Sequence, residues 1–190
     1  MIIRLLKTIA IPVAVMIVAG CGATSSYYML SVPTIPAKTY TALGKSVGVE
    51  KVTLPSYFDK RLLAVAHSSS QISFNSSAVW AEDMNTGLTN RLIGYLQKTF
   101  HQPQVYAYPW DTHTQPELKV RVQVTRFIAE GDRVYLDANW EIANLQNNSH
   151  QAKLFSTSVK TGDTAKSIVQ AMDSAFSQLE TQVAEGMRRF

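Results

Sequence analysis

Two neighbouring segments in the second half of the chain alternate strictly between apolar and polar residues, and this pattern constrains the fold most. The apolar positions are Leu118, Val120, Val122 and Val124 in the first segment, and Val134, Leu136, Ala138, Trp140 and Ile142 in the second. Because side chains in a strand point to opposite faces in turn, each segment has one apolar and one polar face. The turn residues Gly131 and Asp132 between them predict an antiparallel hairpin. Its polar face is expected to carry Lys119, Arg121, Tyr135, Asp137, Asn139 and Glu141.

Two longer segments repeat their apolar residues with the period of an amphipathic helix. We expect the first helix to run from about Ala78 to Phe100, with its N-cap within residues 75–77, and the second to follow Gly162. The two apolar stripes are Trp80, Met84, Leu88, Leu92, Leu96 and Phe100, then Ile168, Val169, Met172, Phe176, Leu179, Val183 and Met187. Each stripe must be buried against another element. The sequence therefore predicts an α+β fold, a largely antiparallel sheet with both helices packed on one face.

Shorter apolar runs between turn residues predict further strands. They lie at residues 27–30, 47–54, 62–67, 71–74, 105–108 and 152–159. In the second of these, the apolar positions change phase between Val49 and Val52. Such a change indicates a bulge, or a strand that is buried on both faces.

The first 20 residues have the layout of an export signal: two cations, then a short apolar run, then small residues. The apolar run, residues 8–19, is shorter than the roughly 20 residues that cross a membrane. Val18-Ala19-Gly20-Cys21 resembles the lipobox of bacterial lipoproteins, where the cysteine receives a diacylglyceryl group and the signal is cut before it. Cys21 is the only cysteine, so an intramolecular disulfide is excluded. The alternative is a free cysteine near the end of an ordinary signal peptide or anchor helix.

These features predict three parts: a lipoprotein signal peptide (residues 1–20), a tether (21–26) and a single periplasmic α+β domain (27–190). Several acyl chains such as palmitate on the mature N-terminus would anchor the chain stably, at about 0.8 kcal/mol per buried methylene. In lipoproteins of Gram-negative bacteria, Asp after the cysteine tends to mean retention in the inner membrane. Because Gly22 stands there, we expect the outer membrane, with the domain on its periplasmic face.

Composition and motifs favour neither a nucleic-acid partner nor catalysis. Two of the charges behind the net charge of +4, Arg4 and Lys7, leave with the signal, and no basic run remains. The four histidines show no metal-ligand spacing, and no nucleophile elbow or phosphate loop occurs. The adjacent carboxylates Glu82 and Asp83 would point about 100° apart on a helix, so they cannot share a proton. We expect Glu82 in the first turn of the helix, and no catalytic residue, metal or cofactor.

Aromatic residues are the remaining candidates. Tyr106, Tyr108 and Trp110 precede a polar loop, either as edges of the core or as a patch for a partner. We take Tyr108, Pro109 and Trp110 as the partner-binding site. Trp80 is interpreted as a core residue, although an interface role stays open. Tyr27 and Tyr28 are expected in a strand, with the membrane interface as the alternative.

Four ordered motifs resemble the PqiC-like family, also called ABC-type transport auxiliary lipoproteins. They are Tyr27-Tyr28-Met29-Leu30, the stretch Val49–Lys60 with Pro55 and Asp59, Trp80-Ala81-Glu82, and Tyr108-Pro109-Trp110. Together they cover nearly all of the mature chain. The chain departs from the family at Phe58, where Leu is usual, and at Ala66-His67, where an Arg is frequent.

The resemblance implies a non-enzymatic accessory subunit of an intermembrane lipid transport system that contributes to envelope integrity. Its partners would be an MCE-domain protein and inner-membrane transport components, and a homo-oligomer is possible. Two alternatives stay open. One is a structural lipoprotein for outer-membrane assembly, and the other is an anchored hydrolase whose Ser, His and Asp meet only in space.

Overall fold

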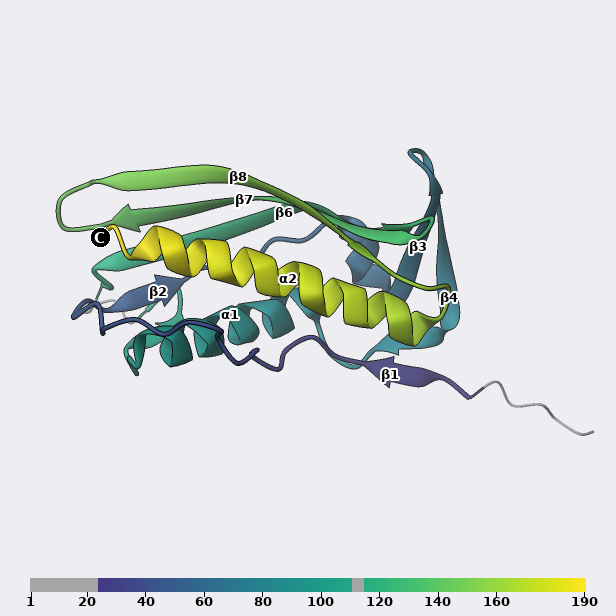
Figure 1. Ribbon diagram of the computed structural model, residues 1–190, viewed down its shortest axis with the longest axis horizontal. Coiled ribbons are helices and arrows are strands. Elements are labelled where there is room, and N and C mark those ends of the chain that lie inside the picture. The colour runs from purple at the N-terminus through teal and green to yellow at the C-terminus, as the bar shows by residue number, and fades with distance from the viewer. Residues whose placement is uncertain (1–23, 111–114) are drawn as a thin grey trace, which may run out of the picture.

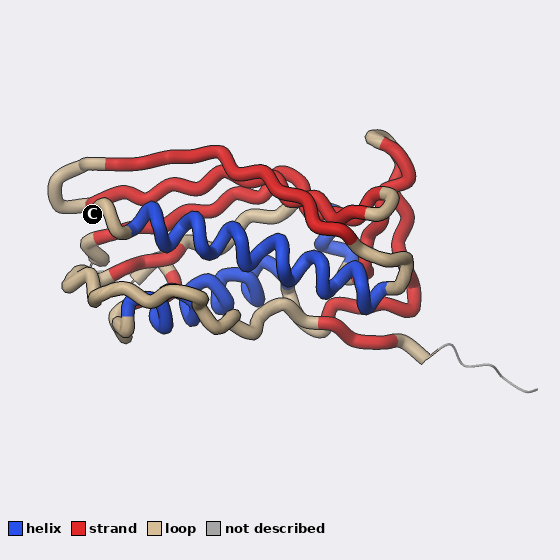
Figure 2. Tube along the Cα trace, in the orientation of Figure 1, coloured by secondary structure: helices blue, strands red, loops and turns tan. Residues whose placement is uncertain are grey.

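The computed structural model describes residues 24–110 and 115–190. Eight strands form one mixed sheet, and two helices lie together on one of its faces (Figures 1 and 2). The elements are β1 (Ser26–Tyr28), β2 (Val47–Val49), β3 (Leu62–Ser68), β4 (Gln71–Trp80), α1 (Met84–Phe100), β5 (Val105–Ala107), β6 (Leu118–Glu130), β7 (Arg133–Asn144), β8 (His150–Lys160) and α2 (Ala165–Met187). The predicted α+β class with both helices on one face is confirmed. The predicted signal peptide and Cys21 lie outside the described residues.

The predicted hairpin forms the centre of the sheet. Strands β6 and β7 pair antiparallel, and the residues of β7 alternate between buried and half-exposed along its whole length. Gly131 adopts a positive φ of 58° at the turn, a conformation that glycine reaches without steric cost. Strand β8 pairs antiparallel with the other side of β7. The long strands are therefore antiparallel, as expected from their alternation.

The short strands make the sheet mixed. Strand β2 pairs in parallel with both β5 and β6, β3 pairs in parallel with β6, and β1 pairs in parallel with β4. Strand β2 ends at Val49 rather than at Leu54, because helix α1 takes over the backbone bonds of Val52. Thr89 Oγ1 accepts from Val52 N at 2.8 Å, and Asn85 Nδ2 donates to Val52 O at 3.0 Å. These bonds explain the change of phase after Val49.

The predicted start of the first helix at Ala78 is wrong. Residues 71–80 form β4, which pairs antiparallel with β3 and ends at the buried Trp80. The helix begins at Met84, capped by the Asp83 side chain, which accepts from Thr86 N at 2.8 Å. Trp80 and Met84 share the spacing of a helix stripe although they belong to different elements. The core interpretation of Trp80 is confirmed, and Glu82 precedes the helix instead of lying in its first turn.

Helix α2 packs closely on the sheet where a glycine faces a large side chain. A Cβ built on Gly186 would lie 2.4 Å from Cη2 of Trp140 on β7, which is shorter than any tolerated contact. The glycine therefore lets the helix backbone approach the indole ring. The core between helices and sheet also buries the stripes that the sequence predicts, from Leu88 to Phe100 in α1 and from Ile168 to Met187 in α2.

A segment between β1 and β2, residues 29–40, crosses the outer side of both helices (Figure 1). We call it the strap. Tyr40 N donates to Thr99 O at 2.7 Å, and Lys98 Nζ donates to Pro33 O at 3.2 Å. Gly94 of α1 makes room for the strap, since a Cβ there would lie 2.4 Å from Pro33 Cγ. The strap is thus a third layer on the side of the helices that faces away from the sheet.

A buried arginine joins the strap to both helices. Arg91 of α1 is fully buried, and its Nε and Nη2 lie 3.1 and 3.2 Å from the two carboxylate oxygens of Glu180 on α2. The same guanidinium donates to Asp173 at 2.5 Å, to Ser177 Oγ at 2.8 Å and to the carbonyl of Leu30 at 3.2 Å. Burial raises the pKa of Glu180 to about 7, although the bonds from Arg91 act in the opposite direction.

We predict that Arg91→Met lowers the free energy of unfolding by about 3–5 kcal/mol, because it leaves a buried carboxylate without its partner. Chemical denaturation measures this loss. The double variant Arg91→Met/Glu180→Leu should recover a large part of it, since no buried charge remains. A double variant as unstable as the single one would contradict a charge effect.

The loss should also depend on pH. The pKa of Glu180 lies above its ordinary value of 4.5 in the folded protein, so its contribution to stability falls as pH rises from about 4.5 to about 7. In Arg91→Met, the neutral carboxyl that forms at low pH needs no counter-charge. The loss caused by Arg91→Met should therefore be smaller at the acidic end of this window than above it.

Candidate interaction surface

The sheet face opposite the helices is covered at one end by aromatic residues. In the parallel pairing of β2 with β5, Tyr106 lies opposite Gly48. A Cβ on Gly48 would lie 2.7 Å from Pro116 Cγ and 3.2 Å from Tyr108 Cδ2. The missing side chain of this buried glycine therefore lets Tyr108 and Pro116 lie directly on the sheet.

Trp110 and Tyr106 form an edge-to-face pair at this end, with ring centroids 5.4 Å apart. Tyr106 is 51% exposed, and Trp110 is half-buried. The indole N–H of Trp110 has no acceptor among the described residues. The predicted residues Tyr108, Pro109 and Trp110 thus lie in an aromatic surface that rests on the sheet, next to Tyr106, whose ring is the one largely open to solvent.

A chain of charges continues from the aromatic rings across the sheet. Lys119 Nζ lies 5.5 Å from the ring centroid of Tyr108 and 3.2 Å from Glu50 Oε1. Arg121 Nε lies 2.6 Å from the other oxygen of Glu50, and Arg121 Nη1 lies 3.8 Å from Glu141. The hydrogen bond from Arg121 holds the pKa of Glu50 below its ordinary value, so Glu50 is ionised at neutral pH. Charges of both signs alternate along this face.

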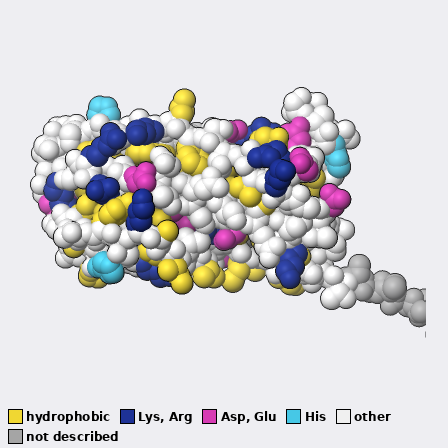
Figure 3. All heavy atoms as spheres, in the orientation of Figure 1, with side chains coloured by type: hydrophobic (Ala, Val, Ile, Leu, Met, Phe, Trp, Pro, Cys, Tyr) yellow, Lys and Arg dark blue, Asp and Glu magenta, His cyan; other side chains and the backbone are white. Residues whose placement is uncertain are grey.

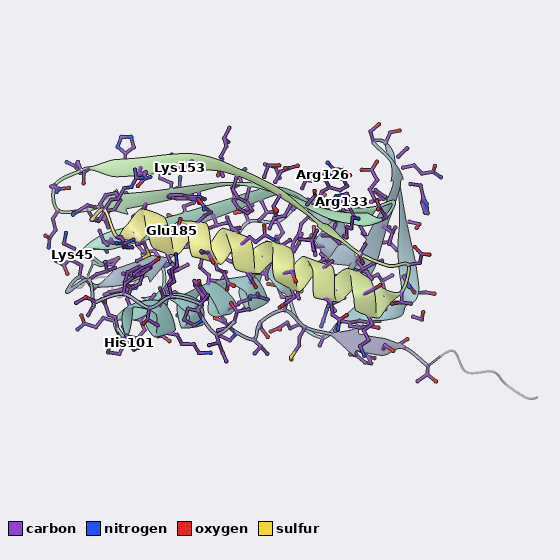
Figure 4. The ribbon with its side chains drawn as sticks, viewed as in Figure 1. Lys45, His101, Arg126, Arg133, Lys153 and Glu185 are labelled. Atoms are coloured by element: carbon purple, nitrogen blue, oxygen red, sulfur yellow. The ribbon has the colours of Figure 1, made fainter. Side chains whose placement is uncertain are left out.

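A shallow hollow of about 290 Å³ follows beside Arg121 and Glu141. Leu154 of β8 lines the hollow. It is an apolar side chain that is 89% exposed, and it lies among polar residues such as Gln123 and Asn139. Lys153 of the same strand, labelled in Figure 4, also lines the hollow. Among the described residues, β8 pairs only with β7, so the strand forms an edge of the sheet here.

We call these residues together the sheet-face surface. It comprises Tyr106, Tyr108, Pro109, Trp110, Lys119, Glu50, Arg121, Glu141, Asn139 and Leu154. Sequence reasoning identified the aromatic residues and the polar face separately, but not that Lys119 joins them. It also missed Gly48, Glu50 and Leu154. A glycine between two valines in a strand was a usable signal, because such glycines often mark a close approach of another segment.

The other motif residues do not belong to this surface. Tyr27 and Tyr28 lie in β1, which confirms their strand role. Asp59 lies in a 3₁₀ helix, Ser56–Lys60, and Pro55 is the N-cap of that helix. Its Phe58 packs on Trp80 with ring centroids 6.2 Å apart. Glu82 packs beside Gly87 of α1. These motif positions mainly support the fold.

A serine and a histidine do meet in space, as the hydrolase alternative requires. Ser73 Oγ lies 2.8 Å from Nε2 of His67 on the neighbouring strand, and both side chains are exposed. Within residues 24–110 and 115–190, no carboxylate hydrogen-bonds to the His67 ring. The same ranges contain no cluster of three or more potential metal ligands.

We predict that Gly48→Ala destabilises the domain by about 1–3 kcal/mol, because the new methyl group displaces Pro116 and Tyr108. Chemical denaturation measures the loss, and near-ultraviolet circular dichroism should report the altered packing of the tyrosine. Gly162→Ala is the matched control, since its Cβ would meet only the Ser167 side chain, at 3.3 Å. Equal stability of the two variants would show that the aromatic residues do not depend on Gly48.

The comparisons with known proteins agree with the observed fold. The model of the family described as the ABC-type transport auxiliary lipoprotein component matches residues 28–184. A search of curated protein sequences gives no match. The crystal structure of an uncharacterized protein is similar, with 20% sequence identity and a TM-score of 0.70 over 86% of this chain and 99% of the other. A Xanthomonas campestris protein of the DUF330 family is similar with 14% identity and a TM-score of 0.70, over 84% and 93%.

The family match spans most of the chain, whereas the two structural likenesses support the fold alone. Within the described residues, neither helix has the length and apolarity needed to cross a bilayer. The ordered motifs, the fold and the family match therefore lead to one conclusion. The chain belongs to the family of ABC-type transport auxiliary lipoproteins.

Proposed function

We propose that this lipoprotein is a non-enzymatic accessory subunit of an ABC-type system that transports lipids between the two membranes. It acts through binding, with an MCE-domain protein and the inner-membrane transport components as its partners, and thereby contributes to envelope integrity. The family match supports the accessory role in transport. The lipid cargo and the MCE partner are part of the proposal.

The observation that carries the proposal is the continuity of the sheet-face surface. Protein interfaces are enriched in Tyr, Trp and Arg, and their energy is concentrated in a few such residues. Tyr106, Trp110 and Arg121 lie on one side of the sheet, joined by Lys119 and Glu50. The helices cover the opposite side, so this face is open to a protein partner.

The proposed anchor is a set of acyl chains on Cys21, in the outer membrane with the domain on the periplasmic side. The support is the lone cysteine after small residues, Gly22 in place of Asp, and the membership of a lipoprotein family.

We predict that Cys21→Ser abolishes processing by the lipoprotein pathway and releases the protein from the outer-membrane fraction. Without the thiol, no thioether to diacylglycerol can form. Mass spectrometry of the wild-type mature N-terminus, together with membrane fractionation of both proteins, measures this. An unmodified Cys21 in the mature wild-type protein would refute the anchor.

We predict that Trp110→Ala weakens capture of the partner by at least about 2 kcal/mol, roughly a 30-fold change in Kd, as expected for an interface tryptophan. Tyr106→Ala should act in the same direction. The domain should stay folded, with a loss of at most about 1.5 kcal/mol from the broken aromatic pair. Pull-down of an MCE-domain protein in detergent and thermal melting are measured on the same preparations.

Tyr27→Ala is the matched control, because Tyr27 is also an exposed aromatic residue, 70% exposed, but lies at the other end of the molecule in β1. Its binding should equal that of the wild type. A loss of about 3–5 kcal/mol in stability for Trp110→Ala would place this residue in the core instead. Capture of outer-membrane assembly proteins in place of transport components would favour the structural alternative.

A further inference from the structure

Exposed apolar side chains gather in the segment that follows the tether. Four of the eight large apolar side chains exposed among the described residues lie within residues 27–35. They are Tyr27 (70% exposed), Met29 (53%), Val32 (64%) and Ile35 (89%). We call them the apolar ridge. Figure 3 shows hydrophobic side chains in a row along the edge of the molecule where the strap runs.

The ridge faces outward because of the conformation of the strap. The exposed positions Met29, Val32 and Ile35 follow one another at intervals of three residues, and the exposed Lys38 continues this spacing. The strap bends at Val32 and again at Ala37 and Lys38, and its prolines Pro33 and Pro36 have φ angles fixed by their rings. Between the exposed positions, Leu30, Pro33 and Thr34 contact the helices.

The inward contacts hold this orientation in place. Leu30 is buried and its carbonyl accepts from Arg91, while Thr34 Oγ1 donates to Glu180 at 3.0 Å. Pro33 packs against Gly94. The strap therefore cannot turn its apolar side chains inward without breaking the buried ion network, so they stay open to a partner outside the domain.

Charges of both signs lie around the ridge. The half-exposed Asp173 accepts from the same guanidinium as the Leu30 carbonyl, and Glu82 follows Ala81, whose N–H donates to Tyr28 O. No Asp or Glu occurs in residues 21–49 or in helix α1, residues 84–100. Lys38 is exposed beside the ridge, and Lys98 reaches the strap from α1. Glu185 of α2, labelled in Figure 4, lines a hollow together with Lys38.

Chain length brings this side of the domain to the membrane. Only four residues, Gly22–Ser25, separate the proposed lipid-bearing Cys21 from the start of β1. Fully extended, they span at most roughly 14 Å, at about 3.6 Å per residue. Tyr27 is therefore within reach of the headgroup region, where amphipathic aromatic rings are favoured.

We propose that the apolar ridge contacts the phospholipid surface that carries the anchor, so that the domain lies with its strap on the membrane. This rests on the proposed function, because the anchor brings the ridge to the bilayer. The helices then separate the membrane from the sheet-face surface, which points toward the periplasm. The lipid is recognised through the interfacial region of its acyl chains.

The lone cysteine makes a direct test possible. In the acylated full-length protein the Cys21 thiol is occupied, so a cysteine introduced elsewhere is the only free thiol. Ile35→Cys and Leu154→Cys are matched, because both wild-type residues are 89% exposed and lie on opposite sides of the domain. Each variant is labelled with an environment-sensitive fluorophore and reconstituted into vesicles of phosphatidylethanolamine and phosphatidylglycerol.

We expect the label at position 35 to shift its emission to shorter wavelengths and to lose most of its intensity to a nitroxide on the lipid acyl chains. The label at position 154 should do neither. If Ile35→Cys folds poorly, the same fluorescence measurements on Val32→Cys test the ridge. Equal behaviour of ridge and control labels would overturn the proposal. Labelling of the wild-type protein at Cys21 would overturn the anchor itself, and with it this placement of the ridge.

Discussion

The buried Arg91 guanidinium holds together three segments that lie far apart in the chain. Leu30 of the strap and Glu180 of α2 are 61 and 89 residues away from it. Burying such a charge without partners costs several kcal/mol, so its bonds must form together. Arg91 thus links the two helices to the start of the strap, beside the core between helices and sheet and the bonds of Thr99 and Lys98 to the rest of the strap. The sheet places the chain only as far as Tyr28 in β1, and the strap beyond it is placed by its contacts with the helices.

The elements that follow from local patterns could be predicted from the sequence. The alternation in β6 and β7 and the stripe of α2 come from burial on one face, which a short window of residues records. The prediction of where α1 starts was wrong for the same reason, because it relied on a short window of residues. Trp80 fits both the end of a strand and the stripe of a helix, and only Asp83, as a cap for Thr86, distinguishes the two. A local pattern cannot locate the boundary between a strand and a helix when the apolar residues of both keep the same spacing.

The features that bring distant segments together could not be predicted. The parallel pairing of β2 with β5 and β6 gives no local signal, because such short strands are defined by their neighbours. The charge chain on the sheet depends on Glu50, which follows β2, meeting Arg121 of β6. Arg91 did leave a trace. It lies three residues after Leu88 and four before Tyr95, within the apolar stripe, as Glu180 does beside Leu179 and Val183. A charge inside each of two stripes indicates a buried pair.

The position of Glu180 near the end of the chain also fixes an order of folding. The docking site of the strap is complete only when α2 has formed, because Glu180 supplies the bonds to Arg91 and Thr34. Contacts across such long separations form late, since the entropy of closing the loop must be overcome first. Export with the N-terminus first, which the proposed signal peptide implies, would leave the strap undocked until α2 has been translocated. During that interval the predicted lipobox, Val18–Cys21, would be accessible to the enzymes that modify and cut it.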